Sequence, residues 1–176
     1  MIRFLVPIVC LVLFFVEPIF GLFSPLSIGG SFYYVVPRFL ILFLIFLTVF
    51  YELRHALFYG LFFGLLYDVF YIDIIGLYSF LYPAVCLIAA YFFKKIPQNL
   101  LSATLLALGL LIAMEVALYL FFQLIGLTDA PAGTFLTSRL WPTLIANALY
   151  LGLLGWVFRS MMVTQDPQRG TKFGLY

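Results

Sequence analysis

The sequence predicts an all-α polytopic membrane protein, built as one bundle of six transmembrane helices with both termini in the cytoplasm. Three observations support this fold class. Hydrophobic residues make up 66% of the 176 residues and charged residues only 9%, whereas a soluble domain is about one quarter charged. Six apolar runs each approach the ~20 residues that a membrane-spanning helix needs. Lysine and arginine are distributed unevenly between the ends of these runs.

The predicted helices follow one another closely, so no room remains for a separate soluble domain. The second and third are short, which a membrane can accommodate by local thinning. We assign residues 1–163 to a single six-helix transmembrane domain and residues 164–176 to a polar cytoplasmic tail. The six predicted spans are residues 4–20, 35–51, 55–70, 74–93, 100–124 and 140–162.

The first predicted span resembles a signal peptide, because a charged start precedes an apolar core. Residues 20–25, FGLFSP, contain no cleavage site of the A-x-A type, and five further spans follow. We therefore interpret residues 4–20 as an uncleaved first helix.

The basic residues set the predicted orientation, since cytoplasmic loops of membrane proteins are enriched in lysine and arginine. Seven of the nine basic residues fall on one side of the predicted spans and two on the other. This bias places both termini in the cytoplasm and makes the longer connections, 21–34 and 126–138, external. The seven are Arg3, Arg54, Lys94, Lys95, Arg159, Arg169 and Lys172, and the two are Arg38 and Arg139.

Several charged residues lie within or at the start of predicted spans, where each costs a few kcal/mol unless it has a partner or a purpose. Glu17 and Arg38 lie about one turn from the external ends of the first two spans, so an ion pair between them is geometrically plausible. Glu115 lies deeper and has no obvious partner, and Arg139 precedes the last span. Two interpretations remain open: pairs that hold helices together, and a polar site that opens outward.

Small residues recur every four positions in the third span, at Ala56, Gly60 and Gly64, and Asp68 continues the series. Residues four apart share one face of a helix. Small residues at this spacing let helix backbones approach closely in a membrane. We interpret the stripe as a docking surface with Asp68 at one end, where it either caps the next helix or pairs with an external basic group.

The sequence offers no set of residues for catalysis, cofactor binding or metal binding. Asp68 and Asp73 are five apart, about 140° around a helix, and do not face each other. Cys10 and Cys86 lie in apolar runs without metal or redox spacing. His55, the single histidine, lies in a polar break between spans. We also expect no binding of nucleic acid.

The third and fourth spans carry a recognisable motif. A glycine-bearing helix ends in GLLYD at residues 64–68, and after a short gap Gly76 opens the next helix as GLYSF at residues 76–80. This pattern resembles the family of the rod shape-determining protein MreD. The specific match covers residues 60–93, and the rest of the chain is similar in length and hydropathy.

The resemblance implies a non-enzymatic membrane scaffold of the bacterial complex that builds the lateral cell wall. Such proteins bind MreC, a bitopic partner, and through it associate with the actin-like MreB, a SEDS glycosyltransferase and a class B penicillin-binding protein. The resemblance also implies a fold similar to the six-helix S-component of energy-coupling-factor transporters. Two alternatives remain: a small-ligand-binding subunit of such a transporter, and a membrane enzyme or other integral membrane protein.

Overall fold

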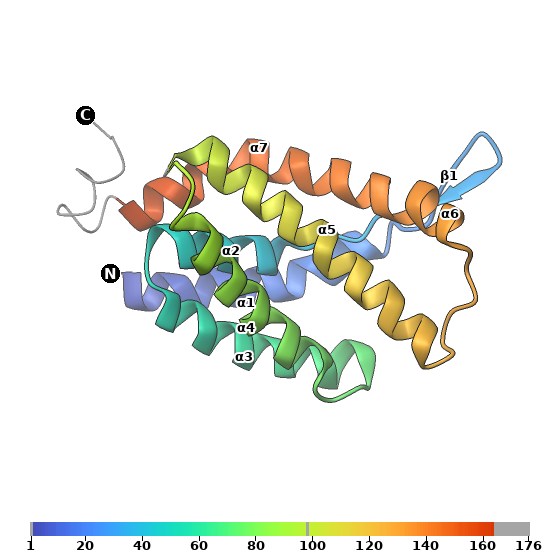
Figure 1. Ribbon diagram of the computed structural model, residues 1–176, viewed down its shortest axis with the longest axis horizontal. Helices are drawn as coiled ribbons and strands as arrows, with labels where there is room; N and C mark the ends of the chain where they lie inside the picture. Colours follow the sequence, from blue (N-terminus) through green and yellow to red (C-terminus); the bar gives the residue numbers. More distant parts are fainter. Residues whose placement is uncertain (1, 98, 164–176) are drawn as a thin grey trace.

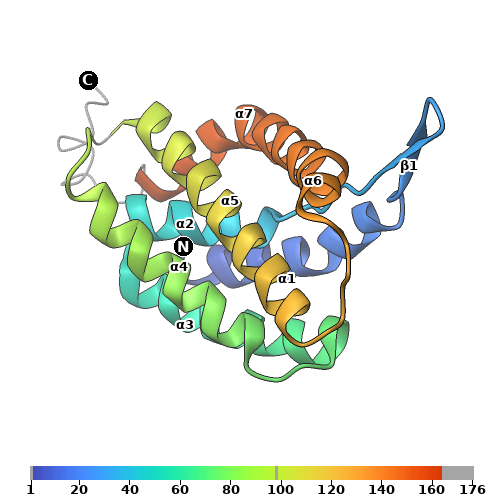
Figure 2. The same cartoon turned by 45° about the vertical axis from the view of Figure 1, so that its right-hand side comes forward.

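The computed structural model describes residues 2–97 and 99–163. The chain runs back and forth along a single bundle of long helices (Figures 1 and 2). α1 (Ile2–Gly21) leads into an antiparallel hairpin of β1 (Leu26–Ile28) and β2 (Ser31–Tyr33), which projects from one end of the bundle. We call this the hairpin end. The first residues of α1 and the last residues of α7 (Trp141–Val163) lie at the opposite end of the bundle (Figure 1).

Each of the six predicted spans contains a helix, and within residues 2–97 and 99–163 four helices are long and apolar enough to cross a membrane. These four are Phe4–Gly21, Leu53–Ile72, Leu100–Leu124 and Ala132–Val163, and two of them include a π-helical turn. The other two, α2 and α4, are shorter. The elements between the hairpin and α7 are α2 (Phe39–Phe50), α3 (Leu53–Tyr67), η1 (Asp68–Ile72), α4 (Leu77–Phe93), α5 (Leu100–Leu124), α6 (Ala132–Phe135) and η2 (Leu136–Leu140).

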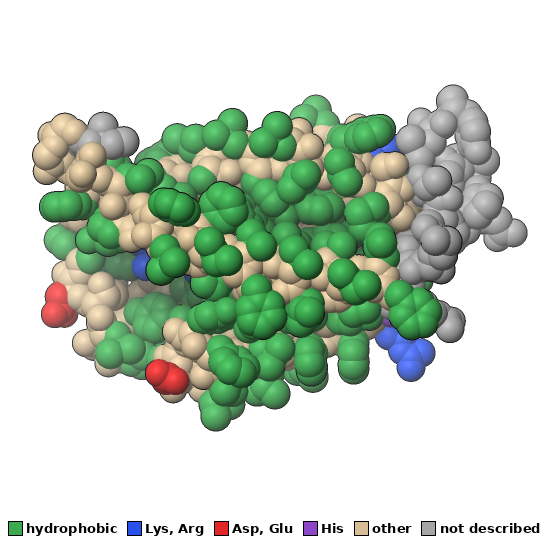
Figure 3. Space-filling model, turned by 180° about the vertical axis from the view of Figure 1, so that it is seen from behind, with side chains coloured by type: hydrophobic (Ala, Val, Ile, Leu, Met, Phe, Trp, Pro, Cys, Tyr) green, Lys and Arg blue, Asp and Glu red, His purple; other side chains and the backbone are tan. Residues whose placement is uncertain are grey.

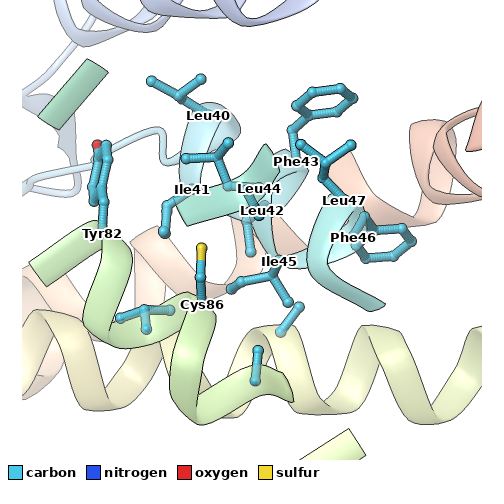
Figure 4. Close-up of a cluster of buried hydrophobic side chains, with 14 of the residues drawn as sticks. Leu40, Ile41, Leu42, Phe43, Leu44, Ile45, Phe46, Leu47, Tyr82 and Cys86 are labelled. Atoms are coloured by element: carbon cyan, nitrogen blue, oxygen red, sulfur yellow. The ribbon is translucent and has the colours of Figure 1, made fainter. Parts of the chain in front are cut away.

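α2 is the centre of the bundle. Eleven of its twelve residues, from Leu40 to Phe50, are buried, and it packs against α1, α3, α4, α5 and α7. Side chains on all sides of α2 contact the surrounding helices, and those on one side face Tyr82 and Cys86 of α4 (Figure 4). A helix that is apolar all round belongs in such a position. Twelve residues span about 18 Å, short of the ~30 Å hydrocarbon layer, so α2 forms core rather than lipid-facing surface.

The outside of the bundle is apolar as well. Large hydrophobic side chains on α1, α3, α5 and α7 are exposed, for example Phe15, Phe58, Leu105 and Leu153. Figure 3 shows one face covered by hydrophobic side chains, with acidic groups near the hairpin end and basic groups near the opposite end. Together with the long apolar helices, this surface fits a protein embedded in a membrane.

Two predicted helix starts are wrong, and one predicted loop contains regular structure. The second helix begins at Phe39 rather than residue 35, because Pro37 disfavours helical geometry at the residue before it. The last helical segment begins at Ala132, eight residues before the predicted start. The predicted loop at 21–34 contains the β-hairpin, whose turn places Gly29 and Gly30 at positive φ. The predicted tail at 164–176 lies outside the described residues.

A backbone hydrogen bond made possible by Pro142 connects the hairpin to the bundle. A proline in a helix leaves the carbonyl four residues earlier without its helical donor, and here that residue is Ser138. The Ser138 carbonyl accepts a hydrogen bond from the Tyr34 backbone N–H at 2.7 Å instead. The chain leaving β2 is thus fixed to the start of the last long helix.

Candidate functional site

Asp68 caps the start of α4. Its Oδ1 accepts a hydrogen bond from the Tyr78 N–H at 2.7 Å, and its Oδ2 accepts from the Gly76 and Ser79 N–H groups at 3.0 and 3.1 Å. The Ser79 hydroxyl also donates to Oδ2, at 2.8 Å. Asp68 is fully buried, and Gly76 adopts φ +110°, which favours glycine. Of the two roles predicted for Asp68, the structure shows the helix cap, in which the carboxylate also meets the positive end of the helix dipole.

The small-residue stripe lies against α4 of the same chain. A Cβ at Gly64 would come within 2.5 Å of the Tyr78 carbonyl oxygen and 2.7 Å of Ser79 Cα. At Gly60 the nearest atom, the Pro83 nitrogen, would be 3.4 Å away, and Ala56 is fully buried. The stripe is therefore a docking surface for a neighbouring helix and is covered within this chain. It is not an outer surface open to a partner protein.

A network of three charged residues crosses the bundle near the hairpin end. Arg38, at the start of α2, places Nε 2.7 Å from Oε1 of Glu115 on α5, and both side chains are buried. Arg139 on η2 places Nη2 3.4 Å from the second oxygen of Glu115. Arg38 also lies over the Tyr78 ring, 5.3 Å from its centre. The predicted Glu17–Arg38 ion pair is wrong: among the described ion pairs, Glu115 is the partner of Arg38.

Glu17 is buried beside this network without a full set of partners. Its Oε2 accepts one long hydrogen bond, from the Leu40 N–H at 3.5 Å, the Tyr67 hydroxyl also lies next to the carboxylate, and its Oε1 has no hydrogen-bond partner. The next residue is Pro18, which leaves the Phe14 carbonyl without a helical donor, and the Tyr71 hydroxyl donates to that carbonyl at 3.4 Å. The polar groups of α1 are thus directed toward η1 and the start of α2.

Thr143 and Asn147 are the polar residues that the sequence reasoning missed. They are buried on α7 and hold the extended segment 34–38. The Val36 N–H donates to Thr143 Oγ1 at 3.1 Å and the Arg38 N–H to Asn147 Oδ1 at 2.9 Å, while Asn147 Nδ2 donates to the Val36 carbonyl at 3.0 Å. Irregular backbone at membrane depth needs such partners. Two polar residues four apart in an apolar helix are the signal that would have found them.

A cavity of about 350 Å³ lies at the hairpin end, between α1, η1, the 34–38 segment and α4. We call it the outer cavity. Glu17, Arg38 and Arg139 line it, and Glu115 binds both arginines. Figure 3 shows a hollow at this end with basic side chains in its wall. The remaining lining residues include Pro18, Gly21, Val36, Pro37, Tyr67, Tyr71, Ile72, Tyr78 and Phe122.

A second hollow is apolar and runs between α1 and α7. We call it the apolar groove, with a volume of about 610 Å³. It exists because α1 packs against α2 and α3 while α7 packs against α2 and α5, which leaves a gap over the start of α2. Its walls include Leu13, Val16, Phe20, Phe39, Ala146, Leu149, Tyr150 and Leu153.

The remaining candidate groups lie apart from these sites. Cys10 and Cys86 are free thiols in the core. His55 Nδ1 lies 2.9 Å from the exposed Glu52 carboxylate, at the end opposite the hairpin. Within residues 2–97 and 99–163, no three histidine, cysteine or acidic side chains cluster as metal ligands would.

Comparison with known proteins agrees with the motif in α3 and α4. No curated protein and no solved structure matches the chain. The family model described as rod shape-determining protein MreD matches residues 1–164. That match covers every long helix of the bundle as well as the Gly64–Asp68 motif, and the chain therefore belongs to the MreD family of membrane proteins that determine rod shape.

Proposed function

We propose that this protein is a non-enzymatic scaffold of the lateral wall elongation complex in the bacterial inner membrane. The observation that carries the proposal is the family match over residues 1–164. The contacts of the buried polar residues support it. Asp68 caps a helix, Glu115 joins two arginines, and Asn147 holds an extended segment. These groups fix the helices and the extended segment relative to one another, which suits a protein that positions other proteins.

The proposed orientation places the hairpin end in the periplasm and the opposite end in the cytoplasm. Arg54, Lys94, Lys95 and Arg159 lie near the end opposite the hairpin, while Arg139 lies at the hairpin end. Basic residues favour the cytoplasmic side. An MreC-like bitopic partner would then meet the hairpin and α6 with the part of its chain outside the membrane.

The apolar groove is the proposed seat of the partner's single transmembrane helix. Its wall on α1 extends from Leu13 to Phe20 and its wall on α7 from Ala146 to Leu153, so it follows the bundle over two turns or more. Its lining is almost entirely apolar, and Ala146 allows close approach of a helix backbone. MreB-like actin, the SEDS glycosyltransferase and the penicillin-binding protein would associate through this partner.

Site-specific crosslinking in cells tests the proposal. A photoreactive residue at Leu149, exposed in the groove, is expected to capture an MreC-like protein. The same residue at Leu105, equally exposed on α5 outside the groove, is the matched control and is expected to capture none. Capture of an MreC-like protein from position 105 but not from position 149 would reject the groove as the binding site. Failure of any MreC-like protein to purify with the tagged chain would reject the scaffold role.

The outer cavity supports a second candidate function, a small-ligand-binding subunit of an energy-coupling-factor type transporter. Charged side chains converge on a cavity that opens at one end of the bundle, as a binding subunit requires. An ATPase module that purifies with the protein would favour this function over the scaffold. Its absence, together with recovery of an MreC-like protein, would reject it.

A further inference from the structure

We propose that the outer cavity binds the head group of a phospholipid in which a primary ammonium lies next to a phosphate. This binding is independent of the scaffold role. The argument rests on three features of the cavity: an acceptor for the ammonium, donors for the phosphate, and a mouth that faces lipid.

Glu17 is the acceptor. It is 2% exposed, it lines the cavity, and its Oε1 has no hydrogen-bond partner. A buried carboxylate oxygen without a donor is costly, so a group that donates to it stabilises the site. Tyr67 and Tyr71 line the same cavity, and aromatic rings attract a cation placed over their faces. Carboxylate and rings together favour an ammonium that carries N–H donors.

Arg38 and Arg139 are the donors. A guanidinium has five N–H groups. Within the described residues, Arg38 donates to Glu115 and also contacts the Tyr78 hydroxyl, Arg139 donates one hydrogen bond to Glu115, and Arg139 Nε is buried without a partner. The unused N–H groups of two arginines that share one wall suit a phosphate, which arginine binds through paired hydrogen bonds. Glu115 balances only one of the two positive charges.

The size and surroundings of the cavity favour a lipid head group. A volume of about 350 Å³ is at the small end of ligand sites, so it accepts a head group rather than a large soluble cofactor. Exposed apolar side chains adjoin its lining residues in sequence, namely Ile19 and Phe20 on α1 and Phe70 on η1. A head group bound inside would leave its acyl chains beside these side chains.

Lipid retention by the purified, delipidated protein tests the proposal, measured by native mass spectrometry. The probes are phosphatidylethanolamine, phosphatidylcholine, whose methylated ammonium has no N–H donor, and phosphatidylglycerol, which has no ammonium. Wild-type protein is expected to retain phosphatidylethanolamine about tenfold better than either of the others, the ratio that one charged hydrogen bond provides. Equal retention of the three lipids would overturn the proposal.

Two variants locate the binding. Glu17→Gln is expected to lower phosphatidylethanolamine retention to the level of phosphatidylcholine, and Arg139→Gln to lower retention of all three lipids. Glu52→Gln, at the end opposite the hairpin, is the control and keeps the wild-type pattern. If Glu17→Gln does not fold, the Arg139→Gln variant still tests the proposal. The Arg139 side chain is partly exposed, so its replacement is expected to leave the fold intact. Wild-type retention by a folded Arg139→Gln or Glu17→Gln variant would overturn the proposal.

A last arm separates a lipid from a soluble ligand with the same chemistry. Free phosphoethanolamine is added at the concentration of the lipid, and displacement of bound phosphatidylethanolamine is measured. Little displacement is expected, because the acyl chains contribute to binding. Complete displacement at equal concentration would assign the site to a soluble zwitterion and overturn the lipid assignment. Partner binding is not measured in any arm, so failure here leaves the scaffold test unaffected.

Discussion

Replacing Gly64 by alanine is expected to force α3 and α4 apart. The new Cβ would lie 2.5 Å from the Tyr78 carbonyl oxygen and 2.7 Å from Ser79 Cα. Both are backbone atoms of the first turn of α4, so no change of side-chain rotamer relieves the overlap. The displacement would also stretch the hydrogen bonds from that turn to Asp68, at 2.7 to 3.1 Å.

The expected loss follows from three contributions. Overpacking costs about 1–3 kcal/mol, and a weakened cap costs about 0.5–2 kcal/mol. Alanine in place of glycine returns about 1 kcal/mol of helix propensity. The net loss is about 0.5–4 kcal/mol, which corresponds to a fall in Tm of roughly 1–16 °C for a chain of this size. Heating the detergent-purified protein and measuring the fraction that remains monodisperse on size-exclusion chromatography gives the apparent Tm.

Two glycines provide matched controls. A Cβ at Gly60 would meet its nearest atom at an ordinary 3.4 Å, and one at Gly152 would meet nothing within 4 Å. Gly60→Ala and Gly152→Ala are therefore expected to keep or raise the apparent Tm. An apparent Tm of Gly64→Ala equal to that of Gly60→Ala would refute the close approach of α3 and α4 as the reason for glycine at this position.

Three further changes test the other buried contacts. Asp68→Asn removes one charged acceptor of the α4 cap and is expected to cost about 2–3 kcal/mol in the same thermal assay, while Asp73→Asn at the exposed end of η1 stays within about 0.5 kcal/mol of wild type. Arg38→Met leaves the Glu115 carboxylate buried without its main partner and is expected to lower the free energy of unfolding by about 3–5 kcal/mol. Adding Glu115→Gln to this variant is expected to recover part of that loss, and additive losses from the two substitutions would contradict the pairing. Pro142→Ala supplies an N–H that competes with the Tyr34 N–H for the Ser138 carbonyl, so amide hydrogen exchange in the hairpin is expected to become faster. Unchanged exchange would show that the Tyr34–Ser138 hydrogen bond does not hold the hairpin.

Helices that the sequence delimits by local signals agree with the structure. α5 has the predicted bounds, 100–124, because Pro97 and Gly126 flank an uninterrupted apolar run. Asn99 caps its start, accepting a hydrogen bond from the Ser102 N–H at 2.7 Å. α2 begins four residues after the predicted start, at the position that Pro37 indicates. Hydropathy alone does not separate an extended apolar segment from a helical one when both are buried.

The partners of the site residues depend on which helices lie side by side in the bundle, and local sequence does not determine that arrangement. Glu17 and Arg38 lie at similar predicted depths on consecutive helices, yet α5 crosses α2 at this depth and brings Glu115 to Arg38. The spacing of Ala56, Gly60 and Gly64 predicts a close backbone approach, and the structure supplies the identity of the approaching helix, α4. Whether such a stripe meets its own chain or another cannot be read from spacing.

The most direct test of the scaffold role is affinity purification of the tagged protein in mild detergent, followed by mass spectrometry of the proteins that accompany it. The proposed function predicts recovery of an MreC-like bitopic protein, and loss of that protein when Leu149 in the apolar groove is replaced by tryptophan but not when Leu105 on α5 is replaced in the same way. Recovery of an energy-coupling ATPase module without any MreC-like protein would contradict the scaffold and identify a transporter subunit.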